Sequence, residues 1–262
     1  MSSSLAFDRA VSFYDKTRAD PDWVADAITN SLMMLGQLTP SSRVLEIGIG
    51  TGRIALPITA RAIGVIGIDL SAAMMDKLRA KIAGQAARVA LAQADANALP
   101  FPDGWFDCAY AVHVYHVVAH WQNALRAAWR VLKPGGHLLI SYNDHDPGAP
   151  FTRLRAQLAE CARQAGIETQ RPGAQSSAEI RAVLDQLGAT QIVPVTRWSE
   201  SVAPARLLEG LAAKIVSETW LIPDAVLVRI MPKVRAWAAR EFGDLDRALE
   251  QSVEFNWLVA QK

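Results

Sequence analysis

The sequence predicts a doubly wound α/β fold with a mostly parallel sheet. Short apolar runs alternate along the chain with stretches in which apolar residues recur at helical spacing. Most of these runs are nearly continuous, which is typical of parallel strands that helices cover on both faces. Alternation of strands and helices indicates βαβ crossovers. The 262 residues, of which 51% are hydrophobic, suffice for one such domain with insertions.

The first half of the chain carries the clearest alternation. Strands are expected at 43–47, 65–69, 89–93, 106–112 and 137–142. Helices are expected at 22–38, 53–61, 71–83 and 121–132. Ser71 is a suitable N-cap for the third helix, and Pro134 with two glycines ends the fourth.

The second half of the chain does not continue the regular alternation of strands and helices. Helices are expected at 150–165, 177–187, 204–219 and 224–242, and strands at 190–198 and 252–259. About 50 residues separate these two strands, and so long an excursion is typical of an insertion over a binding site. We therefore expect one domain over 1–262, with a cofactor-binding core near 20–145. Helical cap insertions, forming a lid, are expected near 146–189 and 200–250.

Composition restricts the classes of partner. The chain has 27 Lys and Arg against 26 Asp and Glu, so no basic field favours nucleic acid or an anionic membrane. No apolar run approaches the roughly 18–20 residues that span a bilayer, so stable membrane insertion is not expected. The two cysteines, Cys108 and Cys161, form no disulfide framework, and we expect a cytoplasmic protein with a small-molecule partner. Nothing in the sequence indicates an oligomeric state.

A glycine-rich turn follows the first expected strand. Gly48, Gly50 and Gly52 alternate with Ile49 and Thr51, and Asp69 ends the next strand. Read from Gly50, the stretch matches the dinucleotide pattern through Ala55, so an NAD-dependent oxidoreductase remains an alternative. The glycines alone do not select the ligand.

Glu46 favours a cationic ligand at this turn. Its carboxylate stands two residues before Gly48, where it would repel the pyrophosphate of a dinucleotide. S-adenosylmethionine instead carries an ammonium and a sulfonium, which a carboxylate attracts. The alternative is that Glu46 faces solvent or caps a neighbouring amide.

Five segments in order resemble the class I S-adenosylmethionine-dependent methyltransferases of the small-molecule type, with a core similar to that of quinone-ring C-methyltransferases. These segments are FDRAVSFYDKTR at 7–18, VLEIGIGTGR at 44–53, GIDLS at 67–71, ADANALPFPDGWFDCAYAVHVYH at 94–116 and RVLKPGGHLLIS at 130–141. The resemblance covers residues 7–145 well and the remainder only in plan. It implies a Rossmann-like sheet of seven strands with the last antiparallel, and S-adenosyl-L-methionine as cofactor.

The resemblance also implies the roles of the cofactor-binding residues. Gly48 and Gly50 would let the backbone approach the methionine part of the cofactor, and Glu46 would face its ammonium. Asp69 would hold the ribose hydroxyls while Leu70 packs on the adenine.

Four further residues complete the implied cofactor site. Asp95 and Ala96 would bind the adenine, although Asp95 could simply terminate a strand in a turn. Tyr14 and Arg18 would reach the cofactor carboxylate, since an arginine fork binds carboxylates bidentately. The alternative for this pair is an ordinary amphipathic helix with a solvated Arg18.

Histidines follow the fourth expected strand. His113, His116 and His120 have spacings that would align on a helix, but no thiol or acidic cluster completes a metal site, and we expect none. His113 is expected beside the transferable methyl, where it would orient the substrate or take its proton. A packing or backbone-contact role for His113 is the alternative.

Aromatic residues indicate an apolar, ring-containing methyl acceptor. The expected substrate pocket contains His116, Tyr142, Trp198 and Trp220, and His145 follows the same strand as Tyr142. The sequence thus predicts an S-adenosylmethionine-dependent methyltransferase acting on a small molecule. A non-catalytic module that binds this cofactor remains a second alternative.

Overall fold

The computed structural model describes residues 4–142 and 146–262, which divide into two compact units. Unit 1 is formed by the described residues within Met1–Asn143, Pro172–Thr196 and Phe255–Lys262. Unit 2 is formed by those within Asp144–Arg171 and Arg197–Glu254. Each unit is described separately below.

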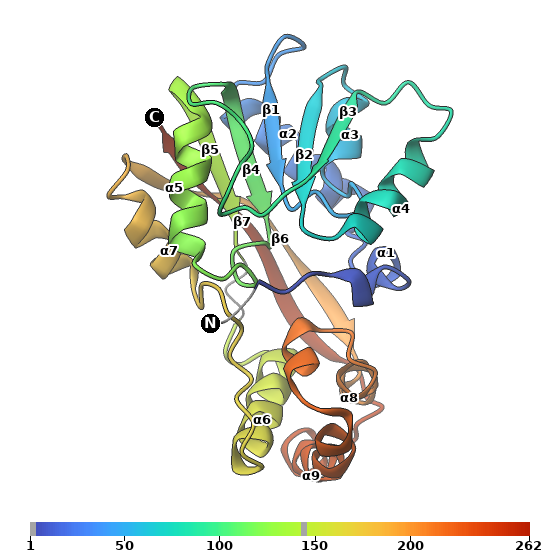
Figure 1. Ribbon diagram of the computed structural model, residues 1–262. Helices are drawn as coiled ribbons and strands as arrows, with labels where there is room; N and C mark the ends of the chain where they lie inside the picture. The colour runs from blue at the N-terminus through green and yellow to red at the C-terminus, as the bar shows by residue number, and fades with distance from the viewer. Residues whose placement is uncertain (1–3, 143–145) are drawn as a thin grey trace. The chain divides into compact units, whose positions relative to one another are not determined.

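A seven-stranded sheet with the order β3-β2-β1-β4-β5-β7-β6 organises the described chain (Figure 1). The strands are β1 Val44–Ile47, β2 Val65–Asp69, β3 Val89–Gln93, β4 Phe106–Val112, β5 Leu132–Ser141, β6 Thr190–Val202 and β7 Leu249–Gln261. Strands β1 to β5 pair in parallel, whereas β7 is antiparallel to β5. The predicted doubly wound sheet with an antiparallel last strand is therefore confirmed.

Helices cover both faces of the sheet in unit 1. They are α2 Asp22–Leu35, α3 Ala55–Thr59, α4 Ala72–Ile82, α5 Trp121–Val131 and α7 Ser177–Leu184. Helices α5 and α7 contact each other on one face, and α2 and α3 contact each other on the opposite face (Figure 1). Because both faces are covered, β1 is buried along its whole length, and every residue in it except Glu46 is apolar.

The predicted element limits hold closely in unit 1. Strands β2, β3 and β4 begin and end where the apolar runs do. Ser71 caps α4 as expected, since its hydroxyl accepts a hydrogen bond from the Met74 N–H at 3.1 Å. Strand β5 begins five residues earlier than expected, because Leu132 is already extended and pairs with Phe106.

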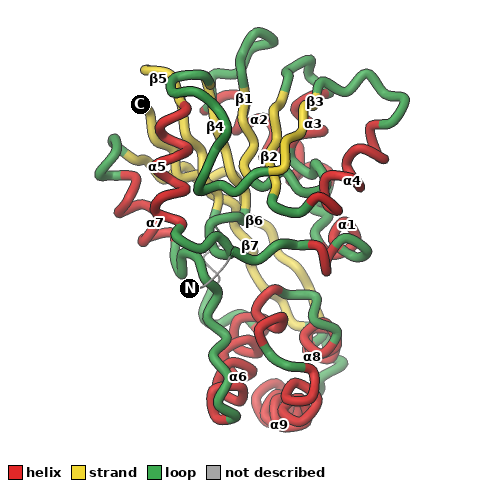
Figure 2. Tube along the Cα trace, in the orientation of Figure 1, coloured by secondary structure: helices red, strands yellow, loops and turns green. Residues whose placement is uncertain are grey.

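Unit 2 contains α6 Pro150–Gln164, α8 Pro204–Ala212, the 3-10 helix η2 Ser217–Leu221 and α9 Asp224–Phe242, drawn in red in Figure 2. The expectation of one helix over 204–219 is wrong. Helix α8 ends at Ala212 because Lys214 adopts a left-handed conformation with φ 56°. The Ile215 N–H then bonds the Gly210 carbonyl at 3.0 Å, a pairing that closes helix C-termini.

Helices α6, α8 and α9 bury their own hydrophobic core. Its fully buried members include Leu154, Leu211, Val234 and Ala238. A separate core in unit 1 forms around Leu45, Phe106, Leu125 and Ile140. Among the described residues, no helix combines the length and the apolar character that crossing a membrane requires.

Candidate functional site

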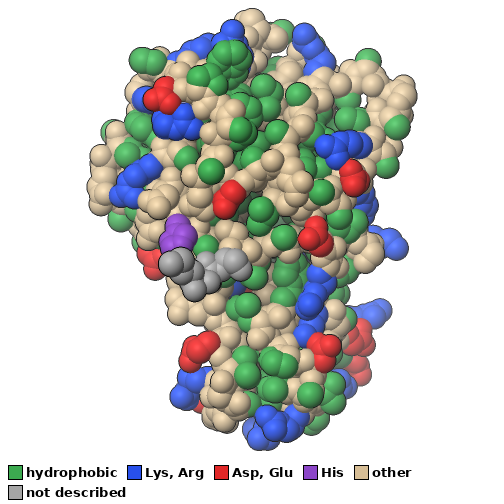
Figure 3. Space-filling view, viewed as in Figure 1, with side chains coloured by type: hydrophobic (Ala, Val, Ile, Leu, Met, Phe, Trp, Pro, Cys, Tyr) green, Lys and Arg blue, Asp and Glu red, His purple; other side chains and the backbone are tan. Residues whose placement is uncertain are grey.

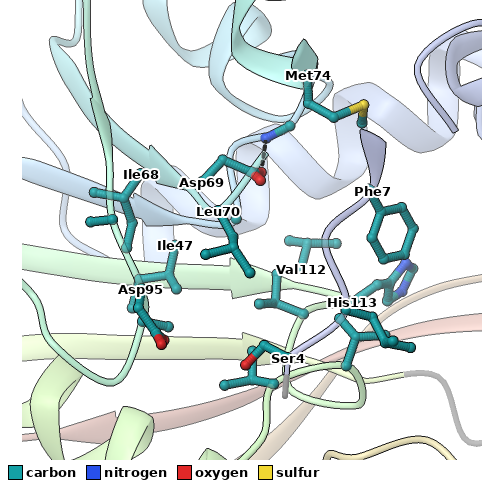
Figure 4. Close-up of a pocket in the computed structure, with 18 of the residues that line it drawn as sticks. Ser4, Phe7, Ile47, Ile68, Asp69, Leu70, Met74, Asp95, Val112 and His113 are labelled. Carbon is teal, nitrogen blue, oxygen red and sulfur yellow. Dashed lines mark hydrogen bonds between the residues drawn. The ribbon is translucent and has the colours of Figure 1, made fainter. Parts of the chain in front are cut away.

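A cavity of about 680 Å³, part of it open to solvent, lies at the carboxyl ends of β1, β2 and β4. These strands are neighbours in the sheet, and β1 lies where the chain order of the strands reverses. Ligands of open α/β sheets bind at such a reversal. All residues that line the cavity belong to unit 1, and Figure 4 shows ten of them labelled.

The glycine turn forms one wall of this cavity. Gly48 and Gly50 line it, and both have positive φ angles, 74° and 53°. The N–H groups of Gly48 and Ile49 bond the Ile68 carbonyl at 2.8 and 2.9 Å, which ties the turn to β2. A Cβ on Gly48 would lie 2.5 Å from Cγ2 of Val114, so packing against Val114 also favours glycine at this position.

Asp69, at the end of β2, supports the turn while it faces the cavity. Its Oδ2 accepts a hydrogen bond from the Gly50 N–H at 2.8 Å, drawn as a dashed line in Figure 4. Its Oδ1 accepts one from the Ser71 N–H, also at 2.8 Å. Burial raises the pKa of Asp69, although these two N–H groups oppose the shift. The neighbouring Leu70 also lines the cavity and is 38% exposed, a large value for a leucine.

Asp95 and Ala96 line the cavity after β3. Oδ1 of Asp95 accepts hydrogen bonds from the main-chain N–H of Asn97 at 2.9 Å and from its side-chain amide at 3.0 Å. This is a local turn of the kind that Asp favours. Asp95 therefore forms a local turn and also lines the cavity.

Glu46 is buried behind the glycine turn and is 3% exposed. It precedes Ile47, which lines the cavity, but Glu46 itself is outside the lining. The Tyr110 hydroxyl donates a hydrogen bond to Oε2 of Glu46 at 2.9 Å. Burial raises the pKa of Glu46 to about 8, against the opposing effects of this hydrogen bond and of Arg53.

The N-terminal segment contributes a second wall. Ser4, Leu5, Phe7 and Tyr14 line the cavity, and the Leu5 N–H bonds the Val117 carbonyl at 3.0 Å. The rings of Phe7 and Tyr14 meet edge to face, with centroids 6.1 Å apart. These residues lie on or before the 3-10 helix η1 Asp8–Ala10 and the short helix α1 Tyr14–Thr17.

Arg18 lies just after α1 and outside the cavity lining. Within the described part of the chain it forms no ion pair with an acid. Burial lowers the pKa of its guanidinium, Arg53 lowers it further, and Tyr14 opposes the shift. A buried guanidinium beside another one favours an anionic group nearby.

His113 follows β4 and lines the cavity. Its φ angle is 56°, and its N–H bonds the Ser141 carbonyl at 3.1 Å. Its ring lies 6.2 Å from the ring of Phe255, measured between centroids. The helical alignment of the three histidines does not form, because α5 begins only after His120.

The expected substrate residues lie outside the lining of this cavity. The rings of His116 and Tyr142 meet edge to face at 6.3 Å, and the Tyr142 hydroxyl bonds the Ala174 carbonyl. Trp198 and Trp220 belong to unit 2, where their indole N–H groups bond Glu200 and the Lys214 carbonyl. His145 lies outside the described residues. Over 4–142 and 146–262, no cluster of His, Cys, Asp or Glu has the arrangement of a metal site.

Sequence reasoning missed much of the apolar lining. The missed apolar residues are Leu5, Phe7, Ile47, Ile68, Met74, Ala94, Val112, Val114, Val117 and Val118, and the polar Ser4 was missed as well. The N-terminal ones lie within or next to the segment 7–18 that the resemblance singled out, which was the available signal. No local pattern marked Val117 and Val118, because they lie in a loop without helical or strand periodicity.

Part of this chain resembles known methyltransferases in sequence. Residues 45–140 match the family model described as a methyltransferase domain. A demethylmenaquinone methyltransferase from Thermus thermophilus is 39% identical over 100 residues, 37% of this chain and 46% of that protein. The ubiquinone/menaquinone biosynthesis C-methyltransferase UbiE of Pseudomonas paraeruginosa is 40% identical over 114 residues, 40% of this chain and 43% of that protein. The chain thus matches less than half the length of these relatives.

Solved structures resemble this chain over nearly its whole length. YcgJ from Bacillus subtilis has a TM-score of 0.62 at 18% identity, covering 89% of this chain and 97% of that one. The cyclase SpnF has a TM-score of 0.61 at 19% identity, covering 100% and 99%. A Haemonchus contortus phosphoethanolamine N-methyltransferase, solved with S-adenosyl-L-methionine, has a TM-score of 0.57 at 20% identity, covering 97% and 57%. At these identities the likeness confirms the predicted fold.

Proposed function

We propose that this protein, whose residues 45–140 form a class I S-adenosylmethionine-dependent methyltransferase domain, transfers a methyl group to a small apolar or ring-containing molecule. One observation carries the proposal. The glycine turn, Asp69, Leu70, Asp95, Ala96 and His113 come from separate segments of the chain and line one cavity.

The residues present fit the cofactor group by group. Asp69 and Asp95 offer carboxylate oxygens for ribose hydroxyls and the adenine amino group, and Leu70 offers an exposed apolar surface for the ring. Gly50 leaves the backbone of the turn open to the methionine part, because a Cβ there would meet nothing nearer than Met74 Cε at 3.5 Å, whereas Val114 covers Gly48. Glu46 lies behind that turn and supplies negative charge for the ammonium, directly or through water. Arg18, which is half-buried and has no acidic partner in the described chain, supplies positive charge for the carboxylate, and the Tyr14 hydroxyl supplies a hydrogen-bond donor.

The same charges disfavour a dinucleotide. A pyrophosphate at the glycine turn would meet Asp69, whose carboxylate already bonds the Gly50 N–H, and it would oppose the ionisation of Glu46 behind the turn. Ionised carboxylates and phosphates repel one another strongly in a partly desolvated site. The oxidoreductase alternative is accordingly not favoured.

The protein's part in the reaction is mainly positional. The cofactor, when bound, supplies an activated methyl carbon with a good leaving group. The enclosing residues Phe7, Val117 and Val118 exclude water and restrict the approach of the acceptor. His113, on the cavity wall, is proposed to orient the acceptor or to take a proton from it when the attacking atom carries one.

The acceptor class rests on the apolar lining and on the charge balance. On the face seen in Figure 3, lysine and arginine side chains are interspersed with aspartate and glutamate, which supports an uncharged small partner over nucleic acid. The matched relatives are named for quinones and their precursors, but their similarity covers only 37% and 40% of this chain. The helical caps and Trp198 and Trp220 are proposed to select the acceptor. A cytoplasmic location is proposed because both cysteines are free and buried.

Calorimetric titration separates the proposed function from its alternatives. We expect S-adenosylhomocysteine to bind and NADH not to bind. Binding of NADH without binding of S-adenosylhomocysteine would refute the proposal. Transfer of a labelled methyl group to a small-molecule panel, with short-chain quinone precursors as one arm, then distinguishes an enzyme from a non-catalytic binding module.

A further inference from the structure

Glu46 and Tyr110 are direct neighbours across two strands that the sequence separates by 64 residues. In the register of the sheet, Glu46 on β1 stands opposite Gly67 on β2 and opposite Tyr110 on β4. Residues opposite each other in neighbouring strands project from the same face of the sheet. Gly67, Glu46 and Tyr110 therefore form a row across three neighbouring strands, on one face of the sheet.

Both sides of this row restrict the Glu46 side chain. On the β2 side, a Cβ on Gly67 would lie 2.1 Å from Cδ1 of Ile49, so the Ile49 side chain fills the space over this glycine. On the β4 side, Tyr110 is fully buried and donates its hydroxyl proton to Oε2 at 2.9 Å. In the described chain, Tyr110 is the one hydrogen-bond donor to the Glu46 side chain.

We propose that Tyr110 is a positioning residue for cofactor binding: its hydroxyl holds the Glu46 carboxylate so that the remaining oxygen stays available to the ammonium group of the cofactor. This inference rests on the proposed function, since it assigns a partner to the residue that receives the ammonium. A carboxylate can accept about four hydrogen bonds, so one donor orients it and leaves capacity for a cation. Hydrogen bonds to charged groups are stronger than those between neutral groups, which makes this single donor effective.

The pair also couples cofactor binding to pH. The groups that act on Glu46 are Tyr110, which favours the ionised form, Arg53, which also favours it, and Asp69, which opposes it. With a pKa near 8, Glu46 in the free protein holds its proton at neutral pH. A bound ammonium favours the carboxylate, so binding releases this proton and affinity increases as the pH rises toward 8.

The test compares two ligands that differ in the ammonium-bearing part. S-adenosylhomocysteine carries the amino acid portion, and methylthioadenosine lacks it. For Tyr110→Phe we expect the affinity for S-adenosylhomocysteine to fall about tenfold, as for loss of one hydrogen bond to a charged group. The affinity for methylthioadenosine should not change. Calorimetry from about pH 6 to about pH 8.5 should also show the pH-dependent rise in affinity displaced to higher pH in the variant.

Tyr115→Phe is the matched control. Tyr115 is equally buried, and its hydroxyl has no hydrogen-bond partner in the described chain, so both affinities should match the wild type. Unchanged affinity and pH dependence in Tyr110→Phe would overturn the inference alone. Equal losses for both ligands would also overturn it, because a general packing defect would explain them. Failure of the wild type to bind S-adenosylhomocysteine would overturn the proposed function itself.

Discussion

His113 combines a place on the cavity wall with a left-handed backbone. A φ angle of 56° is unfavourable for a residue with a Cβ, by about 1–2 kcal/mol. The hydrogen bond from its N–H to the Ser141 carbonyl holds this conformation in place. Strain of this kind persists where the surroundings impose it, and it is common at functional sites. We infer that the position of the imidazole matters more here than the local stability.

Two substitutions at His113 distinguish the effect of the imidazole on turnover from the effect of backbone strain on stability. We expect His113→Ala and His113→Gly both to lose turnover on any acceptor that the panel identifies, with normal S-adenosylhomocysteine affinity. We expect His113→Gly to be more stable than His113→Ala by about 1 kcal/mol in urea denaturation, because glycine adopts this φ freely. Unchanged turnover in His113→Ala would remove the imidazole from the mechanism.

At the scale of elements, the N-terminal segment is fastened to the core by polar side chains. The Ser71 hydroxyl, which caps α4, also donates to Asp8 at 2.5 Å. Asp15 accepts a hydrogen bond from Thr51 at 2.6 Å and pairs with Lys77 and Lys81, each at 3.0 Å. These contacts join η1 and α1 to the glycine turn and to α4. Residues 4–14 are thereby held against the cavity that four of them line.

Asp15→Asn is expected to loosen this segment. Loss of two ion pairs should increase the dissociation rate of S-adenosylhomocysteine several-fold and hasten hydrogen exchange of the segment, since ligand release requires the wall to move. Stopped-flow displacement measures the rate. Asp76→Asn is the matched control, because among the described residues Asp76 pairs only with Arg79, on the exposed face of α4. Equal rates in the wild type and Asp15→Asn would contradict the fastening role.

The acid dependence of this fastening follows from the pKa of Asp15. Burial alone would raise the pKa, but the hydrogen bonds from Thr51, Lys81 and Lys77 lower it to about 2. A lowered carboxyl pKa means that the contribution to stability is fully present above the ordinary value near 3.8. It is lost only as the pH falls through about 2. The segment should therefore remain fastened at all pH values used for binding experiments.

At the scale of the whole molecule, each unit buries hydrophobic residues of its own. The cavity draws its lining from unit 1. The relatives match less than half of this chain, and the solved structures share its fold while they are named for different reactions. Because one fold serves many reactions, the acceptor must be identified from the site and by experiment.

Leu154→Ala tests whether ligand binding in unit 1 depends on the stability of unit 2. Leu154 is fully buried in the core of unit 2, so its truncation should destabilise that unit by about 2–5 kcal/mol. At temperatures below the unfolding transition of Leu154→Ala, the affinity of this variant for S-adenosylhomocysteine should equal that of the wild type. Leu125→Ala makes the same change in the core of unit 1, which contains the cavity. This variant should lower the stability of the complex with S-adenosylhomocysteine. A large loss of affinity in Leu154→Ala would show that the cavity depends on unit 2.

The sequence by itself determined the fold class, most strand and helix limits, the glycine turn and the place of Asp69, Leu70, Asp95 and His113. The fold class, the element limits and the glycine turn follow from periodicity, capping and turn chemistry, which act between residues close in the chain. The place of Leu70, Asp95 and His113 was implied by the resemblance to the methyltransferase family. Only the tertiary structure decided that Tyr110 bonds Glu46, that Val114 packs on Gly48 and that Asp15 fastens the first helix to α4. Each of these contacts joins residues 60 or more positions apart. They depend on strand register and on how the elements pack, which no local stretch of the sequence encodes.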